Sequence, residues 1–465
     1  MTETMKENPL GYEPVGKLLR KFAIPSCIAM VVNALYNIVD QIFIGQGVGY
    51  LGNGATNVIL PFMVLTLAIS LLFGDGCAAY YSQMLGRKEP KKAAKGVISS
   101  LIASVLVCAA LMAVFLIFAE NLCRLTGATD EFMPYALDYG RIVAIGYPLT
   151  GFACAFSAVI RADGSPKFSM LGLISACITN VILDYIFVFP LNMGVKGAAL
   201  ATIIGQLLNV IIYAFYFKRF KSIKLTKDCA KFSFKNIKPV MKLGSSSFIT
   251  QMSAVVIIIV LNNVMVKYGA ESEYGAEIPL TSFGITMKIN NILVSIMAGI
   301  GAGSLPIIGF NYGAGNYDRI KKTIFKAVTA ATICGVIATV FFQFFPAQII
   351  NIFGAENDLY LKFGIMCLRI FLATIILDGL NNSAATYFQA MGKPVYSVTS
   401  SLCRQIVFNV PPLLIFPLFM GVEGCLWAGP VCSIAAFILN FVLLKKGLKG
   451  LKIELSGAMV NNVRA

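Results

Sequence analysis

The chain has 465 residues, of which 57% are hydrophobic and only 13% are charged. A soluble domain carries about 25% charged residues, so this composition excludes an ordinary soluble protein. The 38 basic residues outnumber the 22 acidic ones. They lie in short segments between apolar runs, which is typical of a membrane protein rather than a nucleic-acid-binding one. Histidine is absent, which excludes His-based acid–base catalysis and most zinc sites.

The N-terminal tail, Met1 to Gly16, is polar and lacks a small-residue cleavage site, so we expect the first apolar run to remain as a helix. About 20 apolar residues span the bilayer core as a helix, which satisfies its own backbone hydrogen bonds. The sequence predicts twelve spans, at Leu18–Ile44, Val58–Tyr81, Val97–Phe118, Met133–Phe156, Phe168–Phe189, Val195–Phe217, Val240–Val266, Leu280–Phe310, Thr323–Phe345, Leu359–Ala385, Val395–Phe416 and Val422–Leu444.

The connections between these spans alternate in charge. One set is rich in basic residues, as at Arg87 and Lys88, and the other is poor in them and often acidic, as at Glu120 and Asp130. Basic loops stay on the cytoplasmic side of a membrane. The alternation therefore predicts a multi-pass protein of the cell membrane with both termini in the cytoplasm.

Short motifs recur at a nearly constant offset. Gly194-Val-Lys-Gly197 returns 227 residues later as Gly421-Val-Glu-Gly424. Such repetition predicts an all-α membrane protein with twelve transmembrane helices in two pseudo-symmetric six-helix lobes. We place the N-terminal lobe at 1–220, a basic cytoplasmic linker at 221–238 and the C-terminal lobe at 239–465. Because each lobe has an even number of helices, we expect an axis along the membrane normal and a substrate path between the lobes.

Ionisable side chains inside membrane spans are costly and are therefore candidates for function. In the first lobe, Asp40 shares one helix face with Asn33 and Asn37, because the three are spaced i, i+4, i+7. Counting ~1.5 Å per residue places Asp40 at a similar depth to an acidic residue and a hydroxyl on two other helices. The candidate cation-coupling site comprises Asp40, Asn180, Asp184 and Thr202.

Two acidic side chains with neutral oxygen ligands nearby can hold Na⁺, or they can share a proton. No basic residue at that depth is an obvious partner. The alternative is that such charges only form internal ion pairs that hold helices together. The sequence favours a site for H⁺ or Na⁺ as coupling ion, with no other cofactor.

The second lobe carries a different charged set, Lys288, Asp378 and Arg404. A Lys288–Asp378 ion pair would neutralise both groups, and a role in substrate binding or gating is the alternative. Asp75, between two glycines, is expected in helix packing or a gate. Pro25 lies within the first span and removes a backbone hydrogen bond, so it permits a bend.

The sequence resembles the multidrug and toxic compound extrusion (MATE) family over essentially its whole length, in the variant of bacterial drug exporters. The segments that carry the resemblance are Asn33-Ala-Leu-Tyr-Asn-Ile-Val-Asp40, Gly74-Asp-Gly-Cys-Ala-Ala, Ile160-Arg-Ala-Asp-Gly-Ser-Pro166, Met287-Lys288-Ile289, Pro306-Ile-Ile-Gly-Phe-Asn-Tyr-Gly313, Phe388-Gln-Ala-Met-Gly-Lys-Pro394 and Arg404-Gln405.

This resemblance implies two lobes that form a V, alternating access, and antiport of H⁺ or Na⁺. It implies a cation site on the four first-lobe residues above and a bend of the first helix at Pro25. A glutamate that couples transport in the seventh helix of other members corresponds here to Gln251. The candidates for substrate binding or gating are Asn33, Tyr36, Asn37, Gln251, Lys288, Asp378 and Arg404.

We expect a secondary antiporter, not an enzyme, that exports small amphipathic or cationic compounds in exchange for H⁺ or Na⁺. Its partners would be a small-molecule substrate and the bilayer, with no nucleic acid, and we expect a monomer. The first alternative is a lipid-linked precursor flippase of the same superfamily, but only Lys288 and Arg404 would serve its basic cavity. An intramembrane enzyme and a major facilitator fold fit the motifs less well.

Overall fold

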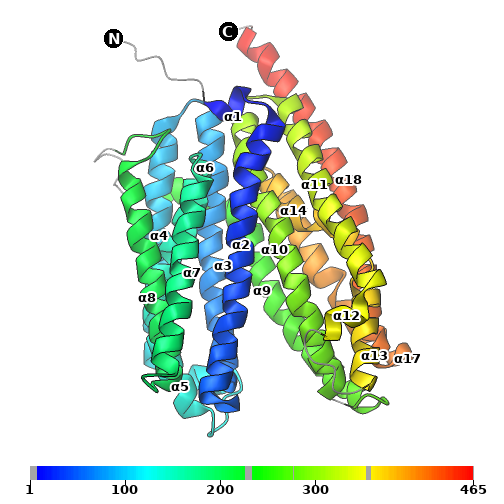
Figure 1. The fold of residues 1–465 in the computed structure, drawn as a ribbon. Helices are drawn as coiled ribbons and strands as arrows, with labels where there is room; N and C mark the ends of the chain where they lie inside the picture. The colour runs from blue at the N-terminus through cyan, green and yellow to red at the C-terminus, as the bar shows by residue number, and fades with distance from the viewer. Residues whose placement is uncertain (1–7, 226–232, 276, 352–357, 464–465) are drawn as a thin grey trace.

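The computed structural model describes residues 8–225, 233–275, 277–351 and 358–463, and every regular element in them is helical (Figure 1). The elements are α1 Pro9–Tyr12, α2 Val15–Val48, α3 Tyr50–Gly86, α4 Pro90–Leu125, α5 Met133–Ile145, α6 Tyr147–Ala162, α7 Pro166–Val188, α8 Gly194–Ala214, η1 Phe215–Lys218, α9 Phe234–Ala270, α10 Glu277–Gly313, α11 Tyr317–Phe344, α12 Pro346–Asn351, α13 Asp358–Met366, η3 Cys367–Phe371, η4 Ile375–Leu377, α14 Asp378–Ala390, α15 Pro394–Leu402, η5 Cys403–Val407, α16 Val410–Ile415, α17 Pro417–Met420 and α18 Val422–Val463.

The predicted twelve-span layout is confirmed. Within the described residues, eleven helical stretches are long and apolar enough to cross a membrane, and the bent pair α5–α6 makes a twelfth. Large apolar side chains lie exposed on the outside of these helices, for example Ile117, Phe325 and Phe344, each more than 70% exposed. Such exposure is expected where a helix faces hydrocarbon instead of water.

The fourth predicted span, Met133–Phe156, is two helices and not one. α5 ends at Ile145 and α6 begins at Tyr147, with a bend of 48° between them. Pro148 lies directly after this break, and its ring nitrogen has no hydrogen to donate to the preceding turn. The corresponding span of the second lobe also loses its α-helical path, between the π-turn η3 and the short 3₁₀ helix η4.

The helix starts support the predicted duplication. α3 and α10 begin at Tyr50 and Glu277, which are 227 residues apart, and α7 and α15 begin at Pro166 and Pro394, which are 228 apart. Figure 1 shows α3 to α8 gathered on one side and α9 to α18 on the other, with α2 between them. α1 and the C-terminal end of α18 lie at the same end of the molecule. We call this the inner end and the opposite one the outer end.

Glycines bring the two lobes into close contact in the inner half of their interface. α2 and α3 of the first lobe pack against α9 and α10 of the second. A Cβ added to Gly76 would lie 2.9 Å from the Gly244 nitrogen, and one added to Gly86 would lie 2.9 Å from Gly313 Cα. Only glycine allows backbones to approach so closely. We call these contacts, between Gly76 and Gly86 of α3 and Gly244 and Gly313 of the second lobe, the inner seal.

An arginine adds polar contacts at the same end. Arg319 of α11 donates through Nη2 to the Leu10 carbonyl at 3.0 Å and to the Glu13 carbonyl at 2.7 Å. The buried Asn311 of α10 donates to the same Leu10 carbonyl at 3.0 Å. The short α1 and the start of α2 are thereby fastened to the second lobe.

The predicted linker 221–238 is described only in part, because residues 226–232 lie outside the described ranges. Its start is held by Asp163, which is buried in the turn between α6 and α7. The Asp163 carboxylate accepts hydrogen bonds from the Tyr81 and Tyr216 hydroxyls at 2.6 and 2.8 Å. It also accepts from the backbone N–H groups of Lys221 and Ser222 at 2.8 and 3.0 Å. The linker thus begins pinned to the first lobe.

Candidate functional site

Two carboxyl groups meet inside the first lobe. Asp40 comes from the outer part of α2 and Asp184 from the last turns of α7, two helices that pack side by side. Asp184 is fully buried, and Asp40 is largely buried. Their side chains lie close enough to interact electrostatically. Two carboxylates in one buried space repel each other, so this arrangement favours a proton on one of the two groups.

The other predicted members of the site surround this pair. With its amide oriented to satisfy both neighbours, Asn180 donates to Asp184 Oδ2 at 2.9 Å and accepts from the Thr202 backbone N–H at 3.1 Å. Tyr36 forms a side-chain hydrogen bond with Thr202 and lies close to both carboxyl groups. Three helices, α2, α7 and α8, therefore bring Asp40, Asn180, Asp184 and Thr202 together, as their depth predicted.

The pair also has unused hydrogen-bonding capacity. In the part of the chain that the structure describes, Asp40 Oδ1 and Asp184 Oδ1 are inaccessible to solvent and accept no hydrogen bond. Leaving a buried oxygen without a partner is costly. The two oxygens, with the Thr202 and Tyr36 hydroxyls nearby, fit a proton or a small hard cation such as Na⁺, which takes oxygen ligands.

Two predicted neighbours of Asp40 do not join the pair, and one unpredicted residue does. Asn33 and Asn37 share a face of α2 with Asp40 but are exposed, and Asn37 donates within the helix to the Asn33 carbonyl at 2.7 Å. The ring of Tyr139, on α5, lies close enough to both carboxyl groups to interact with them electrostatically. Nothing in the apolar run around Tyr139 distinguished it in the sequence.

The second lobe holds a polar cluster of its own. Arg404 lies 4.0 Å from Asp378 in an ion pair, and it donates to Asn382 Oδ1 at 2.8 Å. Asp378 also accepts from the Ser433 hydroxyl at 3.1 Å. Of the two alternatives left open for Lys288, the ion pair with Asp378 is not the one seen among the described residues, because Asp378 pairs with Arg404 instead. Arg404 lies in η5, a single-turn π-helix, and such π-bulges are frequent at functional sites.

An inner cavity of about 230 Å³ lies between the lobes, next to the inner seal. Its lining includes the predicted Gln251 together with Asp75, Arg161, Thr250 and Asn382. The Ser247 hydroxyl of α9 donates to Asp75 Oδ2 at 3.0 Å, so Asp75 bridges the two lobes. Polar side chains of both lobes therefore line this cavity.

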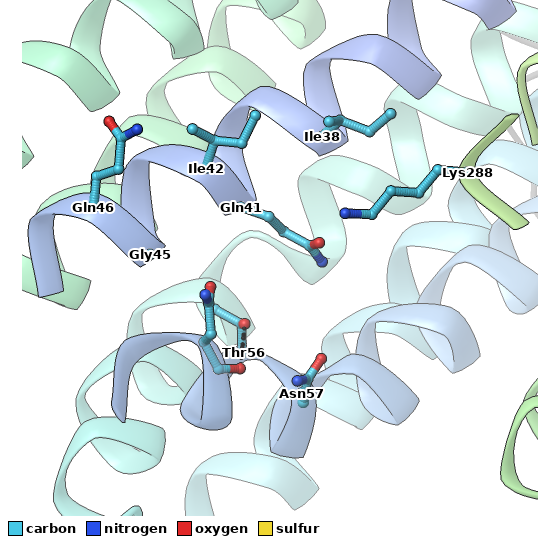
Figure 2. Close-up of a pocket in the computed structure, with 9 residues that line it drawn as sticks. Ile38, Gln41, Ile42, Gly45, Gln46, Thr56, Asn57 and Lys288 are labelled. Atoms are coloured by element: carbon cyan, nitrogen blue, oxygen red, sulfur yellow. Dashed lines mark hydrogen bonds between the residues drawn. The ribbon is translucent and has the colours of Figure 1, made fainter. Parts of the chain in front are cut away.

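Two predicted residues lie elsewhere. Lys288 of α10 lines a second, outer cavity of about 550 Å³ with residues from α2 and α3 (Figure 2). Pro25 is buried inside α2, which continues as one helix from Val15 to Val48. Since Pro25 has no N–H, the helix lacks one hydrogen bond at this position.

Comparison with known proteins decides the family. The MatE family model matches residues 25–186 and 247–415, which together make up more than half of the chain. The chain belongs to the MatE family. The resemblance seen in the sequence is thereby confirmed, and the two matched segments fall one in each half of the chain.

Multidrug export proteins of Staphylococcus resemble this chain over nearly its full length. It is 23% identical over 447 residues to the multidrug export protein MepA of Staphylococcus aureus (strain N315), covering 94% of this chain and 97% of that protein. It is 24% identical over 454 residues to MepA of Staphylococcus haemolyticus, with coverages of 94% and 96%.

Solved structures share the fold of this MatE protein. One is the outward-facing conformation of a multidrug resistance MATE family transporter, with a TM-score of 0.90, 23% identity and coverage of 97% of this chain and 99% of that one. Another is a MOP superfamily transporter from Pyrococcus furiosus, with a TM-score of 0.89, 22% identity and coverages of 97% and 100%. Both likenesses confirm the two-lobed helical architecture.

Proposed function

We propose that this protein is a multidrug efflux transporter that exports small amphipathic molecules in exchange for protons, taken up at Asp40 and Asp184. The family and the full-length similarity to multidrug export proteins support efflux. The single observation that carries the coupling is the close approach of the two carboxyl groups in a buried setting, without a basic partner among the described residues. Two acids in contact share a proton readily, since both cannot be charged at low cost.

Antiport needs two conformations of the transporter, one that binds the coupling ion more tightly and one that binds the substrate more tightly. The inner seal closes one end of the lobe interface, while the outer cavity lies at the other end. In this arrangement the carboxyl pair takes up a proton that enters from outside, as substrate leaves outward. After the lobes rearrange, proton release to the cytoplasm leaves two repelling carboxylates, which favours binding of the next substrate.

The proposal includes the location of the protein, its oligomeric state and the alternative coupling ion. The protein lies in the cell membrane as a monomer, with both termini in the cytoplasm, as the basic loops indicate. Na⁺ is the alternative coupling ion, because the cluster offers only oxygen ligands. It would need both carboxylates ionised and separated enough to hold the ion between them.

Purified protein in liposomes tests the coupling. A panel of cationic, zwitterionic and anionic fluorescent compounds is followed under separately imposed H⁺ and Na⁺ gradients. Asp40→Asn and Asp184→Asn should each abolish gradient-driven transport while leaving the protein monodisperse. Asp138→Asn is the matched control, because Asp138 is a half-exposed acid of the same lobe that pairs with Lys196 at 3.2 Å.

Transport by the wild type under a pH gradient alone supports proton exchange, and transport under a Na⁺ gradient alone replaces the proton with Na⁺. Normal gradient-driven transport by both asparagine variants would remove the carboxyl pair from the mechanism.

A further inference from the structure

The outer cavity differs in chemistry from the carboxyl pair. Its volume is about 550 Å³, within the range of small-molecule sites. α2 and α3 supply most of its wall near their outer ends, and α10 of the other lobe contributes Lys288. Figure 2 shows the Lys288 ammonium pointing toward the amide of Gln41. A molecule in this cavity would therefore touch both lobes at once.

The polar groups of the cavity are amides, one hydroxyl and one cation. Gln41, Gln46, Asn53 and Asn57 contribute carboxamides, which both donate and accept hydrogen bonds. Lys288 is the only charged lining residue, and none of the described lining residues is acidic. Nothing in the wall would neutralise a positively charged ligand.

The Asn53 amide can pack against α2 because residue 45 of that helix is a glycine, which has no side chain. A Cβ at Gly45 would lie 2.8 Å from Asn53 Nδ2, so the amide of α3 rests directly on the backbone of α2. The Thr56 hydroxyl donates its hydrogen to the Asn53 carbonyl at 2.9 Å, so it is not available as a donor to a ligand. Ile38 and Ile42, one helical turn apart on α2, add apolar side chains to the lining. The cavity thus combines an apolar wall with amides held in place.

The acids that could neutralise Lys288 are engaged elsewhere. Asp40 is next to Gln41 in sequence, but its side chain is turned to Asp184 inside the first lobe. Asp378 is paired with Arg404. Within the described chain, Lys288 forms no ion pair, and its side chain is exposed to the cavity. An unpaired ammonium in a partly enclosed space attracts an anion and repels a cation.

We propose that the outer cavity binds the anionic group, such as a carboxylate or phosphate, of an amphipathic substrate, with Lys288 as its charge partner and the amides as hydrogen-bonding partners. This inference rests on the proposed function and narrows its substrate class to compounds that carry a negative group, zwitterions included. It differs from the cationic substrates expected from the sequence.

Transport of two dyes by protein reconstituted in vesicles of neutral phosphatidylcholine tests this. Carboxyfluorescein is the anionic probe and ethidium the cationic one. Lys288→Gln should raise KM for carboxyfluorescein about tenfold, the effect of losing one charge-assisted hydrogen bond, and change ethidium transport less than about twofold. Lys288→Arg should keep carboxyfluorescein transport, and Lys288→Glu should reverse the preference between the dyes. The matched control is Lys267→Gln at the outer end of α9, outside the cavity.

The outcomes separate this inference from the proposed function. If the wild type moves neither dye under any ion gradient, the proposed function fails. If it moves ethidium but not carboxyfluorescein, or if Lys288→Gln affects both dyes equally, only the anion site is overturned. Repeating the transport assay in vesicles that contain anionic phosphatidylglycerol shows whether the anionic group bound by Lys288 belongs to the substrate or to a lipid headgroup. If the Lys288 variants differ from wild type only in these vesicles, the lysine serves a lipid headgroup and the substrate site is rejected.

Discussion

Substitution of Gly244 by alanine tests whether the inner seal holds the lobes closed. The added Cβ would lie 2.7 Å from the Leu72 carbonyl carbon and would collide with its oxygen. Carbon atoms in contact prefer 3.5–4.0 Å, so α3 and α9 would have to separate by about 1 Å. Overpacking of this kind costs about 1–3 kcal/mol. Only the closed state bears that cost, so the open population should rise by about 5- to 150-fold.

Spin labels at two exposed positions at the inner ends of these helices, Lys88→Cys and Lys238→Cys, measure the opening in a background without the native cysteines. Double electron–electron resonance should show a single short distance for the wild type and an added longer one for Gly244→Ala. Gly284→Ala is the control, because nothing lies within 4 Å of its Cβ. An unchanged distance distribution in a folded Gly244→Ala protein would refute the reasoning.

Four further substitutions test other contacts, each followed by thermal unfolding in detergent. Asp163→Asn replaces one carboxylate oxygen by an NH₂ group that faces two of the four donors, so it should lower the free energy of unfolding by about 2–4 kcal/mol. Tyr216→Phe removes only one hydrogen bond and should cost about 1 kcal/mol. Equal losses for the two variants would contradict this account. Arg319→Gln should cost about 2 kcal/mol and also lengthen the distance at the inner end; an unchanged distance would mean that this arginine does not fasten the lobes. The hydrogen bond from Lys362, at 2.8 Å, lowers the pKa of Glu273, so the small stabilisation it gives is present at neutral pH and is lost as the pH falls through that pKa. The melting temperature of Glu273→Gln should therefore lie slightly below wild type at pH 7 and converge with it in acid, and a gap that widens in acid would contradict the sign.

Length and hydropathy located the spans because a bilayer sets the number of apolar residues that a helix needs. The break before Pro148 was missed because the run stays apolar across it. Depth counting brought Asp40 and Asp184 together because helices that cross one membrane share a common depth scale. The shared helix face linked Asn33 to Asp40 in the sequence, but Asn33 lies about 10 Å further along the helix and does not reach the pair.

The sequence alone could not identify the ion-pair partner of Asp378. Two cations, Lys288 and Arg404, were available on different helices, and only the three-dimensional packing selects between them. The outer cavity was also missed, because amides near the ends of α2 and α3 have no spacing that distinguishes them from ordinary surface residues. A weak signal did exist for Asp163, since it is an acidic residue in a loop of the basic set.

Asp163 binds the start of the linker only through hydrogen bonds from the backbone N–H groups of residues 221 and 222. Every residue except proline has the N–H that this contact needs. Most residues should therefore be tolerated at positions 221 and 222, with proline excluded. At position 163, by contrast, only a carboxylate can accept from all four donors, and glutamate would carry it one methylene further from them. Related chains should look variable just where the link between the halves is most firmly attached.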